Sequence, residues 1–224
     1  TRASNRHCWR GFPPPIILAI LLNEVQLQFA RRFVQTVSYL PHFISIMVVC
    51  GIIIDFTGRQ GLINDVIAAL GGKRFPLLLS PGLFRPIYVT SEIWQTMGWS
   101  SIIYLAALSA IDPQLYEAAE MDGAGRLRKI WSISLPGILP TIIILLVLRM
   151  GAMMSIGFEK VILLVNQSTF ETGDVISSFV YRKGLLEFSY SYSAAVGLFN
   201  SAINFSLLLL ANATARRLKQ ASLF

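Results

Sequence analysis

Residues 112–136 read DPQLYEAAEMDGAGRLRKIWSISLP, a polar stretch that separates two long apolar runs of the chain. Asp112 is a favourable N-cap residue, and Pro113 suits the first position of a helix because its missing N–H costs nothing there. The stretch therefore predicts a short helix that ends near Met121.

The second half of this stretch predicts a reversal and another short helix. Gly123 and Gly125 permit a sharp turn because glycine adopts backbone conformations that other residues avoid. A helix over about 126–133 then leads to Pro136. The result is a compact helix–turn–helix, suited to enter a cleft on a soluble partner, with these charged side chains exposed: Glu117, Glu120, Arg126, Arg128 and Lys129.

The composition around this stretch is that of a membrane protein. Hydrophobic residues make up 54% of the 224 residues, and charged residues only 14%, whereas soluble domains carry about 25% charged residues. The net charge of +7 comes from basic residues beside the apolar runs, where juxtamembrane cations are expected. This placement argues against a nucleic-acid partner and in favour of membrane lipids.

The apolar runs predict an all-α, polytopic helical membrane protein. A span needs roughly 20 mostly apolar residues, and four runs reach that length, with a shorter run before them. We expect complete spans at about 33–54, 87–111, 137–158 and 192–214, and a partial span at 12–23. A short surface helix is expected at Leu62–Leu70, within the first of two longer connections.

The basic residues also predict the orientation and the domain limits. Arg31, Arg32, the 112–136 loop and the basic C-terminal tail fall on one side, which the positive-inside rule places in the cytoplasm. Residues 1–10 are polar and basic and are expected to be atypical or disordered. Residues 11–224 are expected to form one domain that lacks an earlier part of its membrane region.

Polar side chains inside the predicted spans are candidates for a substrate path, because such groups are costly in lipid and usually face a cavity or another helix. Arg149 has the charge to bind a carboxylate, although it is as well explained by a structural pair with Glu92 or another buried acid. A helix–helix seam explains the stripe on the fourth span equally well, and a packing contact explains Trp99. The stripe consists of Ser193, Gly197, Asn200 and Asn204. The candidates are Glu92, Gln95, Trp99, Arg149, Asn200 and Asn204.

The sequence offers no sign of chemistry performed by this chain. His7 and His42 stand alone, and Cys8 and Cys50 are too few for a disulfide framework. No G-x-x-x-x-G-K-[ST] stretch is present, so ATP and Mg²⁺ would have to be bound by a partner. We expect no cofactor, no metal site and no catalytic residue.

The 112–136 stretch resembles the EAA loop of bacterial ABC-importer permeases. Glu117-Ala118-Ala119 is followed at the family's spacing by Gly123, by Ile133 and by Leu135-Pro136. The resemblance implies a type I ABC-importer transmembrane domain, incomplete at its N-terminus, whose loop couples to an ATPase. The coupling residues would be Glu117, Ala118, Ala119, Asp122, Gly123, Arg126, Leu135 and Pro136.

Other stretches are similar to the permeases of oligosaccharide and polysaccharide importers, including the branch that handles uronate-containing sugars. They are residues 16–25, 38–45, 98–108 and 112–119. The resemblance implies three kinds of partner: ABC ATPase subunits, a second permease subunit, and an extracellular or periplasmic sugar-binding protein. It also implies a place in the bacterial cytoplasmic membrane, where the loop would move with the ATPase and rock the attached spans.

Two other functions remain as alternatives on the residues alone. An ATP-independent carrier or channel would use Glu92 and Arg149 as coupling or selectivity groups, but would leave the 112–136 pattern unexplained. A membrane enzyme would need a cluster of nucleophile, base or metal ligands, and the isolated histidines argue against one.

Overall fold

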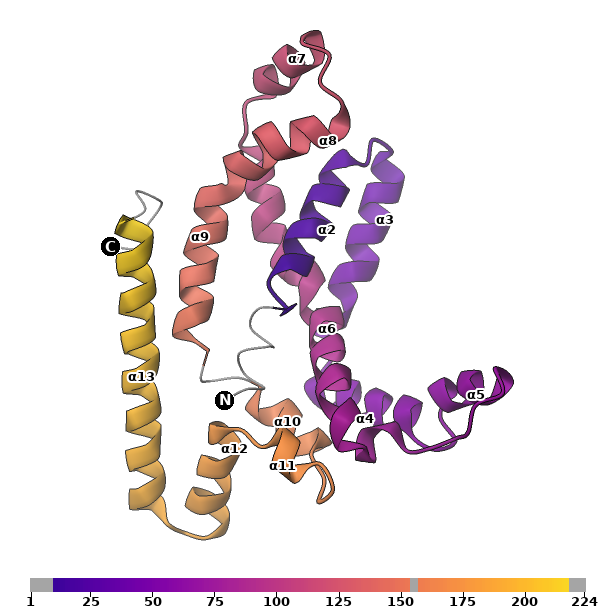
Figure 1. Ribbon diagram of the computed structural model, residues 1–224, viewed down its shortest axis with the longest axis vertical. Coiled ribbons are helices and arrows are strands. Elements are labelled where there is room, and N and C mark those ends of the chain that lie inside the picture. The colour runs from indigo at the N-terminus through magenta and orange to yellow at the C-terminus, as the bar shows by residue number, and fades with distance from the viewer. Residues whose placement is uncertain (1–9, 154–156, 218–224) are drawn as a thin grey trace. The chain divides into compact units, whose positions relative to one another are not determined.

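A computed structural model describes residues 10–153 and 157–217 of the chain (Figure 1). Every regular element in these two ranges is a helix, in agreement with the all-α prediction. The helices form two compact units. One consists mainly of residues 43–93 and 157–205, and the other mainly of residues 10–42, 94–151 and 206–217.

The second of these units is built around α2 (Pro13–Glu24) and the C-terminal half of α6 (Pro81–Ser109). Helix α3 (Gln28–Tyr39) packs closely on α6, since a Cβ atom added to Gly98 would overlap the carbonyl oxygen of Ser38. Helix α9 (Leu135–Gly151) completes the apolar core. Its buried side chains are Ala19, Leu22, Tyr104, Leu105, Leu108 and Ile138.

The other unit joins α4 (Ile46–Thr57), the N-terminal half of α6 and α10 (Phe158–Leu164). Their shared core contains Cys50, Phe84, Tyr88, Val161 and Leu164. The short helix predicted on the surface is α5 (Leu62–Ala69). The connection after α10 is more ordered than a loop, and it contains α11 (Phe170–Gly173), α12 (Ile176–Tyr181) and the π-helical turn η4 (Arg182–Leu186).

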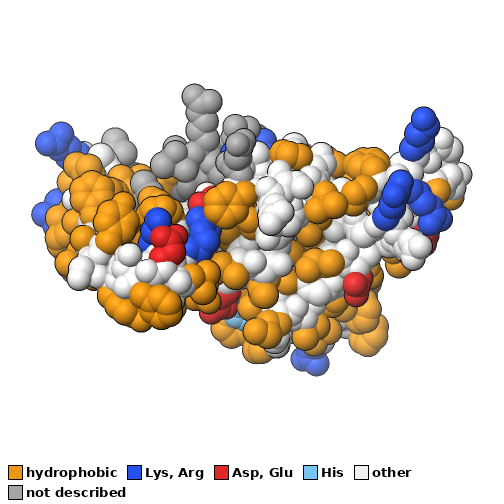
Figure 2. Space-filling view, turned by 90° about the horizontal axis from the view of Figure 1, so that it is seen from below, with side chains coloured by type: hydrophobic (Ala, Val, Ile, Leu, Met, Phe, Trp, Pro, Cys, Tyr) orange, Lys and Arg blue, Asp and Glu red, His pale blue; other side chains and the backbone are white. Residues whose placement is uncertain are grey.

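Three described segments are long and apolar enough to cross a membrane: Ile46–Ala69, Arg126–Gly151 and Tyr190–Arg217. The last is α13, in close agreement with the span predicted at 192–214. Helix α2 corresponds to the predicted partial span and is too short to cross alone. Hydrophobic side chains cover much of the face in Figure 2, and Leu198 and Phe199 of α13 are about 70% exposed (74% and 69%). Such a surface suits lipid or partner helices rather than water.

The prediction of one span over 33–54 was wrong. Helix α3 begins at Gln28, so that Arg31 and Arg32 lie inside it, and it ends at Tyr39. A 3₁₀ turn, η1 (Leu40–Phe43), follows, and α4 starts afresh with Ser45 as its N-cap. Pro41 lies in the turn and cannot donate a helical hydrogen bond, which is why the apolar run breaks into two helices.

Two further helices differ from the limits predicted for their spans, and the first of them, α6, is not among the three segments named above. Helix α6 begins at Pro81, before the predicted start at 87, and continues through Pro86. Helix α9 ends at Gly151, seven residues before the predicted end of the third span, and Gly157 adopts a left-handed conformation (φ +48°) before α10 begins. The atypical segment predicted at 1–10 lies outside the described residues except for Arg10.

Candidate coupling loop and substrate path

The first helix of the 112–136 loop is α7 (Pro113–Met121). It starts as predicted, since the Asp112 carboxylate accepts a hydrogen bond from the backbone N–H of Gln114 at 2.9 Å. Pro113 occupies the first turn. Figure 1 shows α7 joined by a tight turn to α8 (Arg126–Lys129).

The turn after α7 explains why glycine occupies position 123. Gly123 has a φ of +77°, and its N–H donates to the carbonyl of Glu120 at 2.9 Å. The N–H of Ala124 reaches back to the carbonyl of Ala119 at 2.8 Å. These two bonds form a Schellman motif, which satisfies the last carbonyls of a helix and favours glycine at the left-handed position.

A π-helical turn, η3 (Ile130–Ser134), connects α8 to α9. The hydroxyl groups of Tyr116 and Ser134 lie 2.9 Å apart and share a hydrogen bond. Ser134 is almost fully buried (1% exposed). This contact ties α7 to the start of the membrane helix, so the loop is a braced unit instead of a loose connection.

The two glutamates of α7 have different environments. Glu120 forms an ion pair with Lys129 of α8, and the hydrogen bond from Lys129 holds the pKa of that carboxyl below its usual value. Glu117 is exposed, and no ion pair joins it to another described residue. One glutamate thus braces the loop, and the other is available to a partner.

Apolar side chains surround these charges on the loop surface. Leu115, Leu127 and Trp131 are each more than half exposed, and Met121 is 89% exposed. Exposed apolar groups beside charged ones are common at protein interfaces. Leu135 is half-buried and Pro136 exposed at the start of α9, while Asp122 and Arg126 are exposed on either side of the turn.

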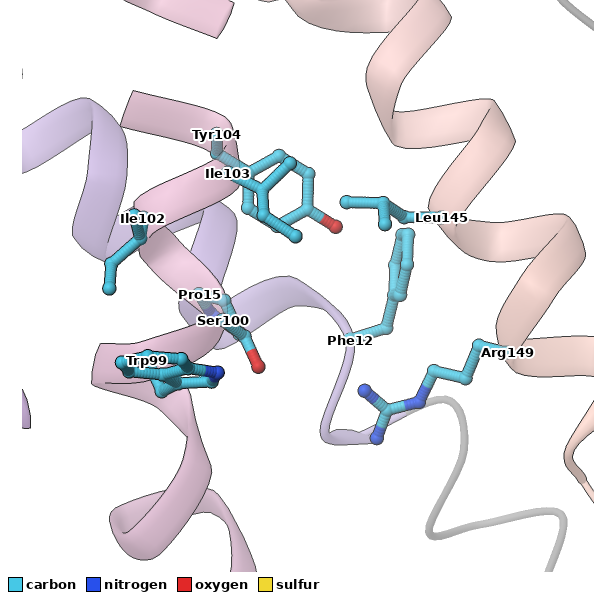
Figure 3. Close-up of a pocket in the computed structure, with 9 residues that line it drawn as sticks. All are labelled: Phe12, Pro15, Trp99, Ser100, Ile102, Ile103, Tyr104, Leu145 and Arg149. Atoms are coloured by element: carbon cyan, nitrogen blue, oxygen red, sulfur yellow. The ribbon is translucent and has the colours of Figure 1, made fainter. Parts of the chain in front are cut away.

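Arg149, near the end of α9, lines a pocket of about 400 Å³. Figure 3 shows its guanidinium group, the Phe12 ring and the Ser100 hydroxyl turned toward the same space, with Trp99 and Tyr104 on α6. The guanidinium donates weakly, at 3.5 Å, to the carbonyl of Gly11. Among the described residues, no carboxylate forms an ion pair with Arg149.

Glu92, the suggested structural partner of Arg149, forms an ion pair within its own unit. Nζ of Lys160 on α10 lies 3.1 Å from the Glu92 carboxylate. Lys160 is fully buried and also lies over the Tyr88 ring, 5.7 Å from its centroid. The third span was predicted to end at 158, just before Lys160. The signal for burial of this side chain was its place inside the mostly apolar run 158–165.

The remaining path candidates occupy several environments. Gln95 is buried on α6, and Trp99 stacks on His42 with ring centroids 4.7 Å apart, which supports its packing role. Asn200 lines a groove between η4 and α13, and its Oδ1 is buried without a hydrogen-bond donor. Asn204 lies one turn further along α13.

Of the stripe predicted as a possible helix–helix seam, Ser193 at the start of α13 makes a contact with another helix. The Ser193 hydroxyl donates to the carbonyl of Val180 at 2.6 Å, and a Cβ atom on Gly184 would overlap Ser193. Ser193 therefore packs against α12 and η4 and is a structural residue.

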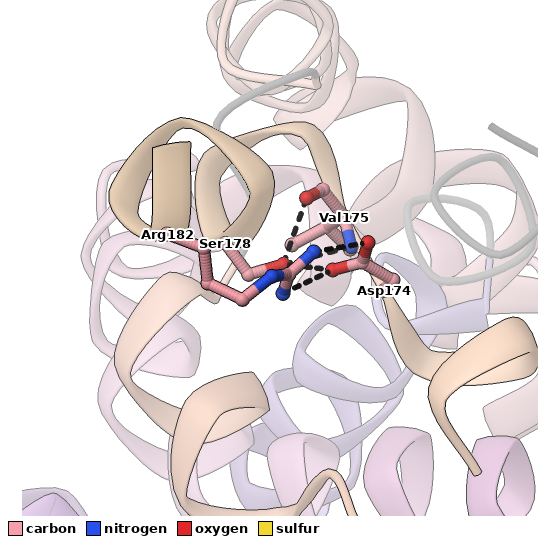
Figure 4. A network of polar contacts seen from close by, with 4 residues as sticks. All are labelled: Asp174, Val175, Ser178 and Arg182. Atoms are coloured by element: carbon pink, nitrogen blue, oxygen red, sulfur yellow. Dashed lines mark hydrogen bonds and ion pairs between the residues drawn. The ribbon is translucent and has the colours of Figure 1, made fainter. Parts of the chain in front are cut away.

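A polar network in the connection after α10 was missed by sequence analysis. Arg182 donates to both carboxylate oxygens of Asp174, at 3.0 and 2.7 Å, and Ser178 donates to the same carboxylate (Figure 4). The Arg182 guanidinium also lies 4.4 Å from the centroid of the Phe170 ring. Partial burial acts to raise the pKa of Asp174, but the hydrogen bonds from Arg182 and Ser178 outweigh it and hold this pKa below its ordinary value.

Within residues 10–153 and 157–217, no group of three His, Cys, Asp or Glu side chains is arranged to hold a metal ion. Cys50 is buried among apolar side chains, as expected for a small core residue.

Comparison with known proteins identifies the family. Residues 11–220 match the family described as "Binding-protein-dependent transport system inner membrane component". The polygalacturonan/rhamnogalacturonan transport system permease protein YteP of Bacillus subtilis is 46% identical over 214 residues, which are 95% of this chain and 67% of that protein.

Two solved structures are also similar. A bacterial alginate ABC transporter, crystallised in complex with an alginate pentasaccharide-bound periplasmic protein, contains a chain with a TM-score of 0.96 and 43% identity. The match covers 99% of this chain and 77% of that one. A bacterial ABC transporter involved in the import of the acidic polysaccharide alginate matches with a TM-score of 0.95 and 44% identity, over 98% and 77% of the two chains.

These matches account for the 112–136 pattern, which neither a membrane enzyme nor an ATP-independent carrier explains. The chain belongs to the family of binding-protein-dependent transport system inner membrane components, and it is a membrane permease subunit of an ABC transporter.

Proposed function

We propose that this permease imports acidic oligosaccharides and that the 112–136 loop transmits the movement of a separate ATPase to the spans. The observation that carries the coupling is the braced loop, in which Tyr116 contacts Ser134 at the start of α9. A braced loop moves as a rigid body with its partner, whereas a loose one would absorb the movement.

The chemistry of the loop surface supports an ATPase partner. Glu117 is exposed and is not used in an ion pair within the described part of the chain, while Leu115 and Met121 expose apolar surface on the same short helix. A carboxylate within an apolar patch suits a basic group in a cleft of the partner. ATP and Mg²⁺ would be bound there, since no P-loop occurs in this chain.

The coupling proposal is tested by charge reversal of Glu117. In Glu117→Lys we expect loss of ATPase co-purification and at least a tenfold loss of uptake, the factor that about 1.4 kcal/mol produces, with normal membrane insertion. The matched control is Glu187→Lys, which reverses an exposed glutamate in the other connection and should leave co-purification unchanged. Normal co-purification and uptake in Glu117→Lys would refute the docking role.

The proposal that the cargo is acidic is supported by Arg149 and by the similar proteins. Its guanidinium group lines a pocket with the aromatic rings of Phe12 and Tyr104, and a guanidinium binds carboxylates by paired hydrogen bonds. Aromatic faces in turn pack on the apolar faces of sugar rings. The relatives named above are transporters of polygalacturonan and alginate. We propose that a sugar-binding protein delivers the cargo, and that a second permease completes the path.

Arg149→Met separates carboxylate binding from a structural role. Uptake is compared for tri-galacturonate and for its fully methyl-esterified form, which keeps the same rings but lacks the charges. We expect uptake of the acid to fall by on the order of tenfold relative to the ester, because one charge-assisted contact is lost. An equal loss for both sugars would assign Arg149 to structure alone.

A further inference from the structure

The pocket that Arg149 lines also receives two hydroxyl groups from one face of α6. Ser100 and Tyr104 are four positions apart on this helix, so their side chains lie one above the other on the same side. Both residues line the pocket of about 400 Å³. Figure 3 shows the oxygen atoms of both side chains turned toward the side of the pocket that holds Phe12. The pocket therefore offers hydroxyl groups as well as a guanidinium group.

The protein itself leaves both hydroxyl groups unused. Neither of them forms a hydrogen bond with another residue in the described ranges 10–153 and 157–217. The neighbouring Ser101 shows the alternative, because its hydroxyl donates to the carbonyl of Gly98 at 2.6 Å. A serine within a helix can satisfy its hydroxyl in this way without any ligand. The Ser100 hydroxyl is directed to the pocket instead.

The position of the Tyr104 hydroxyl is fixed by the packing of its ring. Tyr104 is only 3% exposed, and it belongs to the apolar core that contains Ala19 and Ile138. A phenylalanine would fill this core equally well, whereas an unpaired hydroxyl group in such surroundings is costly. A group that is held in place before its ligand arrives loses little entropy on binding. The arrangement is that of a binding group, since packing alone does not need the oxygen atom.

We propose that Tyr104 and Ser100 determine which sugars the pocket accepts, by hydrogen bonding to ring hydroxyls of the uronate whose carboxylate Arg149 binds. The inference rests on the proposed function, because it places the same cargo in the same pocket. A uronate carries its carboxylate and its C2 and C3 hydroxyls on one ring, and a pocket of about 400 Å³ lies at the small end of the range for ligand sites. Arg149 recognises the charge of this ring, while Tyr104 and Ser100 recognise its hydroxyl groups.

Hydroxyl recognition has a consequence that charge recognition lacks. A site that hydrogen-bonds to a substrate hydroxyl discriminates strongly against an analogue without it, because the group on the protein is then left unpaired. An apolar pocket discriminates far less between the same two molecules. Import should therefore depend on the ring hydroxyls of the cargo, and it should do so even when the charge of the cargo is unchanged.

The test measures uptake at low sugar concentration, in proteoliposomes that contain the complete importer. The sugars are tri-galacturonate and two deoxy forms, in which the C2 or the C3 hydroxyls are replaced by hydrogen. For the wild type, we expect at least one deoxy form to be taken up on the order of tenfold more slowly than the parent sugar. In Tyr104→Phe, the parent should lose a similar factor and that deoxy form should lose little more, so their uptake ratio approaches one.

The same variant separates hydroxyl recognition from charge recognition. Tyr104→Phe keeps the ring that packs in the core, and Arg149 is intact, so the preference for tri-galacturonate over its methyl ester should remain. Ser100→Ala should lower the parent-to-deoxy ratio in the same way for the hydroxyl that it contacts. The matched control is Ser101→Ala, because Ser101 is fully buried, is bonded to Gly98 and does not line the pocket. It should leave both ratios unchanged.

The outcomes distinguish this inference from the proposed function. Equal losses of the parent and of both deoxy forms in Tyr104→Phe would assign Tyr104 to packing and overturn its role. Wild-type uptake that is insensitive to both replacements would show that the two hydroxyl groups contact only water, and the proposed function would still stand. If the wild-type importer takes up none of these sugars, the proposed cargo is wrong, and the inference fails with it.

Discussion

The hydroxyl groups of Tyr116 and Ser134 lie 2.9 Å apart, and through them the helix before the Gly123 turn is fastened to the π-helical turn after it. The two residues are 18 positions apart in the sequence. Because Ser134 is buried, it cannot exchange this partner for bulk water. The contact therefore favours one position of α7 relative to α9.

Removing the phenolic oxygen should loosen the loop without changing its shape. For Tyr116→Phe we expect the loop to be destabilised by about 1 kcal/mol, because the Ser134 hydroxyl is left without its partner. The loosening is measured as faster hydrogen exchange in α7 and as weaker coupling of ATP hydrolysis to uptake. The double variant, Tyr116→Phe with Ser134→Ala, should recover most of the stability, since neither group is then unsatisfied. Unchanged exchange in the single variant would contradict the bracing role.

Gly123 provides a second test of the loop. A Cβ atom there would meet nothing within 4 Å, so the cost of substitution comes from the backbone at φ +77°. We expect Gly123→Ala to destabilise the turn by about 1 kcal/mol and Gly123→Asn by less, because asparagine tolerates this conformation. Amide exchange at Asp122–Ala124 measures the effect.

Gly125 is the matched control for this turn. Its φ is −70°, it has the same open surroundings, and it is the N-cap of α8. Gly125→Ser should be neutral or stabilising, because serine is a favourable N-cap. Equal effects at positions 123 and 125 would exclude the left-handed backbone as the cause.

The Asp174–Arg182 pair predicts a pH-dependent connection between α10 and α13. The pKa of Asp174 is lowered in the folded protein, so the pair stabilises the fold above the carboxyl's ordinary pKa. This stability is lost as the pH falls through the lowered value. We expect 170–182 to exchange faster in acid, while Asp174→Asn should exchange faster at neutral pH and lose that dependence.

We expect Asp174→Asn to destabilise the connection by about 1.5 kcal/mol, which is at the low end for hydrogen bonds to charged groups. A value at the low end applies because the side chains of Arg182 and Asp174 are 28% and 25% exposed, and solvent weakens the attraction between them. A variant with the same pH dependence as the wild type would show that another group titrates.

The close approach of α3 to α6 at Gly98 makes this position intolerant of any side chain. A Cβ atom would overlap the backbone carbonyl of Ser38, which cannot rotate away. We expect Gly98→Ala to lower the free energy of unfolding by about 1 to 3 kcal/mol, because the backbone must shift to make room. The measurement is thermal stability in detergent. The control is Gly51→Ala in α4, where a Cβ atom meets nothing within 4 Å and should be tolerated. Similar stabilities for both variants would contradict the close packing.

Local sequence determined the elements whose ends are signalled by residues nearby. Asp112 and Pro113 predicted the start of α7, Gly123 predicted its turn, and the apolar run at 192–214 predicted most of α13. Caps, turns and apolar length depend on neighbouring residues, so they can be recognised without the rest of the chain. Pro41 is also a local signal, but a proline within an apolar run can either kink one helix or separate two. The sequence alone therefore did not reveal that α3 and α4 are separate helices.

The partners of the charged residues were decided only by tertiary structure. Nothing near Glu92 in the sequence indicates Lys160, which lies 68 positions away and forms an ion pair with it. In the loop, both Glu117 and Glu120 were predicted to be exposed, but the turn brings Lys129 to Glu120 alone. A sequence shows which charged residues a membrane protein must accommodate. The packing of distant helices decides which of these residues are paired, because an ion pair needs two atoms within a few ångströms of each other. Closeness of the two residues along the chain is not required.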